Sequence, residues 1–236
     1  MKPFQFKQFS IEQDQCSMKV GTDGVLLGAW ADVDNAKSAL DIGTGTGVIS
    51  IMLAQRNTEV QVDAVEIDQV ACEQAQTNFA NSPFADRLSA KTISIQDYIR
   101  ESATTYDLIV SNPPFFSGGT FSQSQERNQV RHTVKMPHNA LLQAARRLLN
   151  KNGKFCVVLP LIEGLRFQEL AEQVGLFTTK ITEVKPKAEK SVERLLLQME
   201  WQEKTLQKNQ LVIQKDARND WTEEYIQLTG DFYLKM

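Results

Sequence analysis

The stretch "LDIGTGTGVIS" (residues 40–50) links an apolar run to a helical pattern through a glycine-rich turn. Because Gly43, Gly45 and Gly47 lack Cβ atoms, the backbone can turn tightly there and a ligand can lie against it. The spacing is G-x-G-x-G, whereas the dinucleotide-binding turn is G-x-G-x-x-G and holds a pyrophosphate. Asp41, two residues before the first glycine, would repel a phosphate. The turn therefore favours a ligand that carries cationic groups.

Strand-like and helix-like patterns alternate on both sides of this turn. Buried strands are predicted at "SALDIG", "VQVDAVEI", "LSAKTISI", "YDLIVS" and "KFCVVLP". Helices are predicted over about residues 46–56, 69–81, 137–150 and 163–175. This alternation predicts an α/β fold, a doubly wound and mostly parallel sheet with helices on both faces. At its end, "FTTKITEVKP" and "VERLLLQMEW" are typical of an antiparallel pair of strands.

The composition is that of a single soluble globular domain. Of the 236 residues 42% are hydrophobic and 23% charged, enough for one substantial core. We expect an extension over residues 1–36, a core over 37–201 and a packed tail over 202–236. Three cysteines, far apart and without metal-ligand spacing, predict neither a disulfide framework nor a metal site. No apolar segment is long enough to cross a bilayer, so we expect a cytoplasmic protein.

The charge distribution is uneven along the chain. Residues 1–126 contain 8 Lys and Arg against 16 Asp and Glu, whereas residues 127–154 contain 7 Lys and Arg and no acid. A basic block of this kind can hold a polyanion such as RNA, although a solvated helix face has the same composition.

Two acids follow the next two predicted strands. Glu66 lies 23 residues after Gly43, where a carboxylate can accept hydrogen bonds from both hydroxyls of a ribose. Asp97 is expected at the end of the third strand, where it can accept from an adenine amino group. The carboxyl ends of parallel strands form the ligand crevice of an open sheet. A ribose, an adenine and a cationic group together favour S-adenosylmethionine over a nicotinamide cofactor.

The fourth predicted strand ends in Asn112, Pro113, Pro114 and Phe115. The Asn112 side-chain oxygen and the Pro113 carbonyl can accept the two hydrogens of a planar amine, which directs its lone pair toward a methyl donor. The prolines fix the backbone and offer no competing N–H donor. Phe115 can stack on a nucleobase, an interaction worth about 1–3 kcal/mol. Together these four residues predict methylation of a flat exocyclic nitrogen, and Asn112 would contact both amine and cofactor.

In this order, "LDIGTGTG", "VEID" and "NPPF" resemble the class I S-adenosylmethionine-dependent methyltransferases that modify amino groups. The stretch "KVGTDGVLLGAW" resembles the motif that closes over the methionine end of the cofactor in that group. The resemblance implies that Thr22 and Asp23 are its polar contacts. It also implies a Rossmann-like sheet of seven strands with the last strand antiparallel.

A closer resemblance covers nearly the whole chain. "KVGTDGVLLGAWA", "SNPPFF", the "RH" of "QVRHTV" and "EEYIQLTGDFY" are similar to the bacterial tRNA adenine-N6 methyltransferases that act on adenine 37, beside the anticodon of a valine tRNA. Thr133 departs from this pattern, because an acid is expected after Arg131 and His132. The resemblance implies that basic residues near the exit of the NPPF segment bind the phosphates of an anticodon stem-loop. These residues are Arg127, Arg131, His132, Lys135, Arg146 and Arg147.

Two alternatives remain open at this stage. An NPPF segment also suits other planar nitrogens, namely guanine N2 in ribosomal RNA or a glutamine amide on a protein. A non-catalytic S-adenosylmethionine-binding module is the alternative from a different functional class.

Overall fold

The computed structural model describes residues 2–16, 18–114, 138–217 and 219–235. In this part of the chain, an eight-stranded sheet has the order β10-β8-β9-β7-β6-β3-β4-β5. Its strands are β3 (Ser38–Ile42), β4 (Gln61–Glu66), β5 (Leu88–Thr92), β6 (Tyr106–Ser111), β7 (Leu149–Pro160), β8 (Phe177–Lys187), β9 (Arg194–Glu200) and β10 (Gln207–Gln214). Neighbours pair in parallel, except that β9 runs antiparallel to both β7 and β8.

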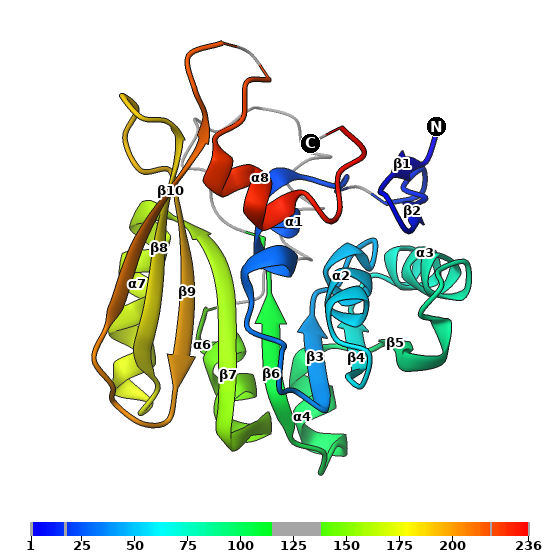
Figure 1. Ribbon diagram of the computed structural model, residues 1–236. Helices are drawn as coiled ribbons and strands as arrows, with labels where there is room; N and C mark the ends of the chain where they lie inside the picture. The colour runs from blue at the N-terminus through cyan, green and yellow to red at the C-terminus, as the bar shows by residue number, and fades with distance from the viewer. Residues whose placement is uncertain (1, 17, 115–137, 218, 236) are drawn as a thin grey trace, which may run out of the picture.

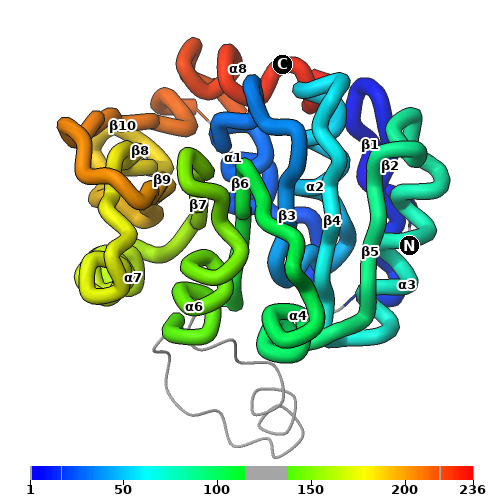
Figure 2. Tube along the Cα trace, turned by 90° about the horizontal axis from the view of Figure 1, so that it is seen from below, coloured from blue at the N-terminus to red at the C-terminus, as the bar shows by residue number. Residues whose placement is uncertain are grey.

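Helices cover both faces of the sheet. Figure 2 shows α1 (Thr22–Trp30), α2 (Val48–Arg56) and α8 (Glu223–Thr229) on one side, and α4 (Ile95–Glu101), α6 (His138–Leu148) and α7 (Leu161–Gln173) on the other. Helix α3 (Gln69–Ala80) contributes Phe79 to the core on the α2 face. A 3-10 turn, Ala85–Arg87, leads into β5.

Alternation along the central strands builds the two cores. In β7, Cys156 and Val158 belong to the core beneath α1 and α2, while Phe155, Val157 and Leu159 belong to the core beneath α6 and α7. Successive side chains of a strand point to opposite faces. A strand covered on both faces therefore has an uninterrupted apolar sequence.

The expected fold class is confirmed, but the details of the sheet differ. We expected seven strands with the last antiparallel. The structure has β10 as an eighth strand, paired in parallel with β8, and the antiparallel strand is β9. The sequence of β10, "QKNQLVIQ", hides this strand, because at this exposed edge only Leu211 is buried.

The predicted strand "LSAKTISI" is shorter in the structure, because a helix cap follows it. Ser94 caps α4 by accepting from the backbone N–H of Asp97 at 3.1 Å, so β5 ends at Thr92. Helix α8 is capped in the same way by Thr222, which accepts from the N–H of Tyr225 at 3.2 Å.

The carboxyl edge of the parallel strands carries several extra segments. In Figure 1, α1, α8 and the small hairpin of β1 (Phe4–Gln5) and β2 (Ser10–Ile11) lie above this edge. Parts of the extension and of the tail thereby meet over the ends of the central strands. None of the described helices has the length and apolarity needed to span a membrane.

Candidate functional site

A cavity of about 450 Å³ opens at the carboxyl edge beside the ends of β3 and β6. Its wall combines the glycine turn, the segment before α1, the first turns of α1 and α2, and the residues after β6. The lining residues are Met18, Lys19, Val20, Gly21, Thr22, Asp23, Gly24, Gly43, Thr44, Gly45, Thr46, Val48, Ile49, Asn112, Pro113, Pro114 and Arg194.

The three glycines of the turn have different surroundings. All have positive φ angles, 74° at Gly43, 55° at Gly45 and 83° at Gly47, in the region that disfavours side chains. Apart from Gly45 itself and its two chain neighbours, no described residue has a heavy atom within 4 Å of the position that a Cβ would take there, so this backbone borders open space. A Cβ at Gly47 would lie 2.5 Å from Cε1 of Phe79. Gly47 therefore serves the packing of α3, and it does not line the cavity.

Asp41 lies beneath the turn and is fully buried. Its Oδ2 accepts hydrogen bonds from Oγ1 of Thr44 and Oγ of Ser50, both at 2.7 Å, while Oδ1 has no partner among the described residues. Burial raises the pKa of this carboxyl to about 6, against the lowering effect of the two hydroxyls. Asp41 is not in the cavity wall, so it acts on the site through the turn that it supports.

Glu66, at the end of β4, also holds the turn. Its Oε2 accepts from the N–H of Gly45 at 3.0 Å, and its Oε1 accepts from the N–H groups of Ile67 and Asp68 at 2.8 and 3.0 Å. The carboxylate is therefore anchored beside Gly45, the glycine with the open face, although it does not line the cavity.

The expected position of Asp97 is wrong. It lies in the first turn of α4, exposed, instead of at a strand end. Its carboxylate accepts from Ser94 at 2.6 Å and pairs with Arg100 at 2.8 Å. A helix-capping arrangement thus accounts for this acid, which is absent from the cavity wall.

Asn112 reaches the cavity because the end of β6 is tied to the end of β3. The Ser111 hydroxyl donates to the carbonyl of Ile42 at 2.8 Å, which places the next residue beside the glycine turn. The Asn112 amide nitrogen lies 3.9 Å from the position that a Cβ would take at Gly24. Pro113 is buried and Pro114 exposed. The last member of the motif, Phe115, lies outside the described residues.

Helix α1 is anchored at both ends. At its start, Nε of Arg194 pairs with Oδ2 of Asp23 at 2.9 Å, joining α1 to the beginning of β9. At its end, Nε1 of Trp30 donates to Thr182 of β8 at 2.9 Å, and the Lys180 ammonium lies 4.5 Å from the centre of the Trp30 ring. Thr22 and Asp23 are thereby held at the cavity mouth.

The segment before α1 is fixed by α3. Buried Asn78 accepts from the N–H of Glu12 at 2.9 Å and donates to its carbonyl at 2.9 Å, and it also donates to the carbonyl of Thr46 at 2.8 Å. Gln13 accepts from the N–H of Val20 at 2.8 Å, closing a loop over residues 13–20. The wall that faces the glycine turn is thus built from backbone held at several points.

The predicted RNA-binding residues divide into two groups. Arg127, Arg131, His132 and Lys135 lie outside the described residues. Arg146 and Arg147 are exposed in the last turn of α6, directly before Leu149, which pairs with Tyr106 at the start of β6. They therefore lie at the amino edge of the sheet. The expectation that they flank the exit of the NPPF segment is wrong, because an 11-residue helix separates them from it.

Of the predicted site residues, seven line the cavity together: Thr22, Asp23, Gly43, Gly45, Asn112, Pro113 and Pro114. Sequence reasoning missed Lys19, Gly21 and Gly24, although the quoted "KVGTDG" contains them. It also missed Arg194, for which the sequence offers no signal, because 171 residues separate it from Asp23.

Comparison with known proteins agrees with this architecture. The family model "Methyltransferase small domain" matches residues 20–185. Among solved structures, a predicted O-methyltransferase from Agrobacterium tumefaciens superposes with a TM-score of 0.69 at 15% identity, covering 89% of this chain and 96% of that one. The ribosomal protein L11 methylase of Lactobacillus delbrueckii superposes with a TM-score of 0.52 at 16% identity, covering 75% and 76%. At these identities the likeness is one of fold.

Sequence relatives are much closer and cover the full length. The chain is 47% identical to the tRNA1(Val) (adenine(37)-N6)-methyltransferase of Trichodesmium erythraeum, over 98% of each chain. It is 46% identical to the protein of the same name in Flavobacterium psychrophilum, over 99% of this chain and 100% of the relative, and 47% identical to that of Haemophilus influenzae, over 100% of both. The chain therefore belongs to the methyltransferase small domain family, together with these tRNA1(Val) (adenine(37)-N6)-methyltransferases.

Proposed function

We propose that this protein transfers a methyl group from S-adenosylmethionine to N6 of an adenine in tRNA, namely adenine 37 of tRNA1(Val). The observation that carries the proposal is the convergence of Asn112 and Gly45 on one cavity, in a chain about 46% identical to named enzymes of this activity over its full length. A tRNA substrate also implies a cytoplasmic protein.

The residues of the cavity, together with Glu66 beside Gly45, suit the cofactor. The open face of Gly45 leaves room for a ligand against the backbone. Oε2 of Glu66, which has one donor in the structure, keeps acceptor capacity for a ribose hydroxyl. Thr22 and Asp23 supply polar groups for the methionine end. When bound, S-adenosylmethionine supplies an electrophilic methyl group on a sulfonium, with a neutral thioether as leaving group.

Asn112 acts on the acceptor nitrogen. Its side-chain oxygen and the Pro113 carbonyl accept the two N6 hydrogens, so that the nitrogen lone pair is free to form the new C–N bond. One N6 proton is then lost to water, so the methylated nitrogen ends neutral. Because a methylated aromatic amine cation is acidic, the reaction needs no strong base and depends on positioning of the amine. Positioning can lower the activation barrier by up to about 7–11 kcal/mol.

The test is transfer of labelled methyl groups to tRNA from a strain that lacks this protein, followed by nucleoside analysis. We expect N6-methyladenosine in tRNA1(Val). Asn112→Ala should lower kcat by roughly 10²–10³-fold, the usual loss for one preorganised hydrogen-bonding group, while cofactor affinity is retained.

Asn150→Ala is the matched control, because that amide donates to Asp107 at the amino edge of the sheet, outside the cavity. Label in guanine N2 or in a protein glutamine would replace the adenine assignment. Cofactor binding without transfer to any RNA or protein would point to a binding module instead.

A further inference from the structure

A second and larger cavity, of about 780 Å³, lies over the same edge of the sheet. It is formed by the start of α1, the last residues of β8 and β10, and the beginning of β9. Residues from both the extension and the tail complete it. Its lining includes Phe4, Gln5, Gln214, Trp221, Tyr225 and Tyr233. We call this cavity the tail groove. Its volume lies within the about 300–1,000 Å³ typical of ligand pockets.

The tail groove lies next to the cofactor cavity. Both are lined by residues 20–23 and by Arg194. The ion pair between Arg194 and Asp23 lies on this shared wall and neutralises the Asp23 carboxylate. A substrate presented to Asn112 therefore has the tail groove directly beside it.

Four of the side chains that line the tail groove are aromatic. Phe4, Trp221 and Tyr233 are only half-buried, although each packs against the core. The rings of Trp221 and Tyr225 lie 5.4 Å apart between centroids, and those of Phe4 and Tyr233 lie 6.3 Å apart in an edge-on arrangement. Half-exposed rings from both ends of the chain thus face one groove.

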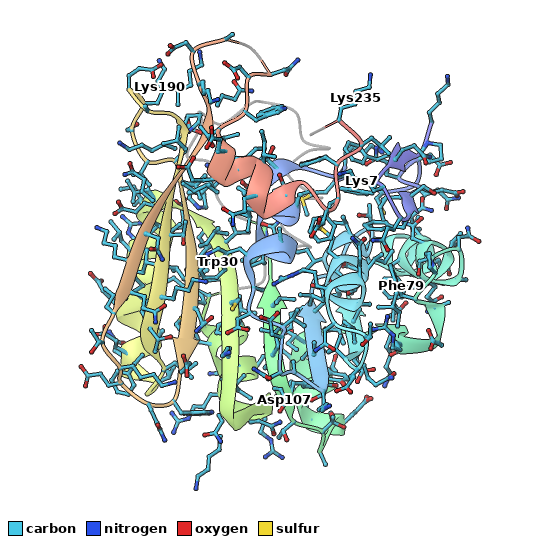
Figure 3. The ribbon with its side chains drawn as sticks, viewed as in Figure 1. Lys7, Trp30, Phe79, Asp107, Lys190 and Lys235 are labelled. Carbon is cyan, nitrogen blue, oxygen red and sulfur yellow. The ribbon has the colours of Figure 1, made fainter. Side chains whose placement is uncertain are left out.

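The polar groups of the groove and its rim fit an anionic ligand with hydrogen-bonding edges. Gln5 and Gln214 supply side-chain amides, which both donate and accept. The rim segment 185–194 carries Lys185, Lys187, Lys190 and Arg194 against two acids. Figure 3 shows Lys190 and Lys235 on this side of the molecule. Within the described residues, none of the ion pairs involves Lys185, Lys187, Lys190 or Lys235.

We propose that the tail groove binds the unpaired nucleotides adjacent to the target adenine, with Trp221 and Tyr233 stacking on their bases. The inference rests on the proposed function and adds to it the way in which the substrate is held. Single-stranded RNA is recognised by stacking of splayed bases on aromatic side chains, with cations along the backbone. Aromatic faces, amides and lysines match that chemistry, and the wall shared with the Asn112 cavity places the tail groove beside the target adenine.

The first test locates the neighbouring nucleotides directly. An anticodon stem-loop carrying 5-iodouridine on either side of the target would be irradiated with the full-length protein, and the crosslinked peptides identified. We expect crosslinks to the aromatic residues Trp221 or Tyr233 for at least one position. Crosslinks that map only outside the tail groove would overturn the proposal.

The second test asks whether the Trp221 side chain and a base beside the target contribute to binding through the same contact. Trp221→Ala should raise KM for the stem-loop by about 5- to 150-fold, the range reported for one stacked base, with cofactor KM unchanged. Trp221→Phe, which keeps an aromatic face, should recover most of the loss. An abasic site beside the target should weaken the wild type to a similar extent and should have no additional effect in Trp221→Ala, because the two changes remove the same contact.

Trp201→Ala is the matched control. That tryptophan is also half-buried, but it donates to the carbonyl of Leu149 at the amino edge of the sheet and lines neither cavity. The KM of the Trp201→Ala variant for the stem-loop should stay at the wild-type value even if the variant is less stable. Additive effects of Trp221→Ala and the abasic sites would reject the tail groove as an RNA site. Failure of the wild type to methylate any tRNA would instead reject the proposed function.

Discussion

Asp41 is a buried carboxyl whose protonation is coupled to the shape of the glycine turn. One oxygen accepts from Thr44 and Ser50, and the other has no partner among the described residues. Removal of a charge from water is costly unless hydrogen bonds compensate for it. Burial therefore raises the pKa of Asp41 from its ordinary value of 3.8 to about 6.

This shift predicts a specific pH dependence of stability. Between about pH 4 and 6 the folded protein binds a proton at Asp41 that the unfolded chain has already released. The stability that this group contributes is therefore fully present below pH 4 and is lost as the pH rises through 6. The contribution of this single group is about 3 kcal/mol at most. Urea unfolding at a series of pH values measures it. Asp41→Asn, which cannot titrate, should flatten this part of the profile, and an unchanged slope would contradict the assignment.

At the scale of elements, the turn between β3 and α2 has two glycines with separate tasks. Gly45 borders open space, whereas Gly47 lies against the Phe79 ring of α3. Phe79 is labelled in Figure 3, beside α2 and α3. One glycine thus leaves room for a ligand, and the other lets two helices approach.

The pair Gly45→Ala and Gly47→Ala separates these tasks. Both substitutions strain a positive φ, at about 1–2 kcal/mol. Gly47→Ala also forces a methyl group into Phe79, which adds about 1–3 kcal/mol, so it should be the more destabilising of the two in denaturant unfolding. Gly45→Ala should lower cofactor affinity more than stability, as titration calorimetry would measure. If the two variants were equally unstable, the division of roles would be wrong.

At the scale of the whole molecule, the tail is part of the core. Leu211 of β10, Tyr225 of α8 and Phe232 are all at least 95% buried and belong to the cluster that includes α1 and α2. Both ends of the chain also meet over the carboxyl edge, where Phe6 forms a bridge with Tyr233. We therefore propose that residues 202–236 unfold cooperatively with the rest of the chain.

A variant that ends at residue 201 tests whether the tail is needed for cooperative folding. Full burial of a large apolar side chain contributes about 1.5–3 kcal/mol, so loss of these three removes a large part of a typical stability of about 5–15 kcal/mol. We expect the shortened chain to lack a cooperative thermal transition. A transition with the wild-type midpoint would make the tail an independent appendage.

Particular residues show how much of the fold and of the site could be predicted from the sequence alone. The glycine spacing, the strand before it and Asn112 after β6 are local patterns, and they predicted the fold class and five of the residues that line the cavity, namely Gly43, Gly45, Asn112, Pro113 and Pro114. The other two, Thr22 and Asp23, were implied by the resemblance to a known family. The edge strand β10 escaped prediction because an exposed edge needs only one buried side chain. Asp97 and Arg146 were misplaced because a helix cap and a helix length, which the pattern defines only loosely, determine where they lie.

The sequence by itself determined a glycine turn after a buried strand, the alternation of strands and helices, and an Asn-Pro-Pro-Phe segment after a strand, because each depends on near neighbours in the chain. Only the tertiary structure decided that Arg194 pairs with Asp23 and that Phe4 shares a groove with Trp221. Those contacts depend on the order of strands in the sheet and on where the two ends of the chain cross it. That order is set by packing of the whole core, which no local spacing records.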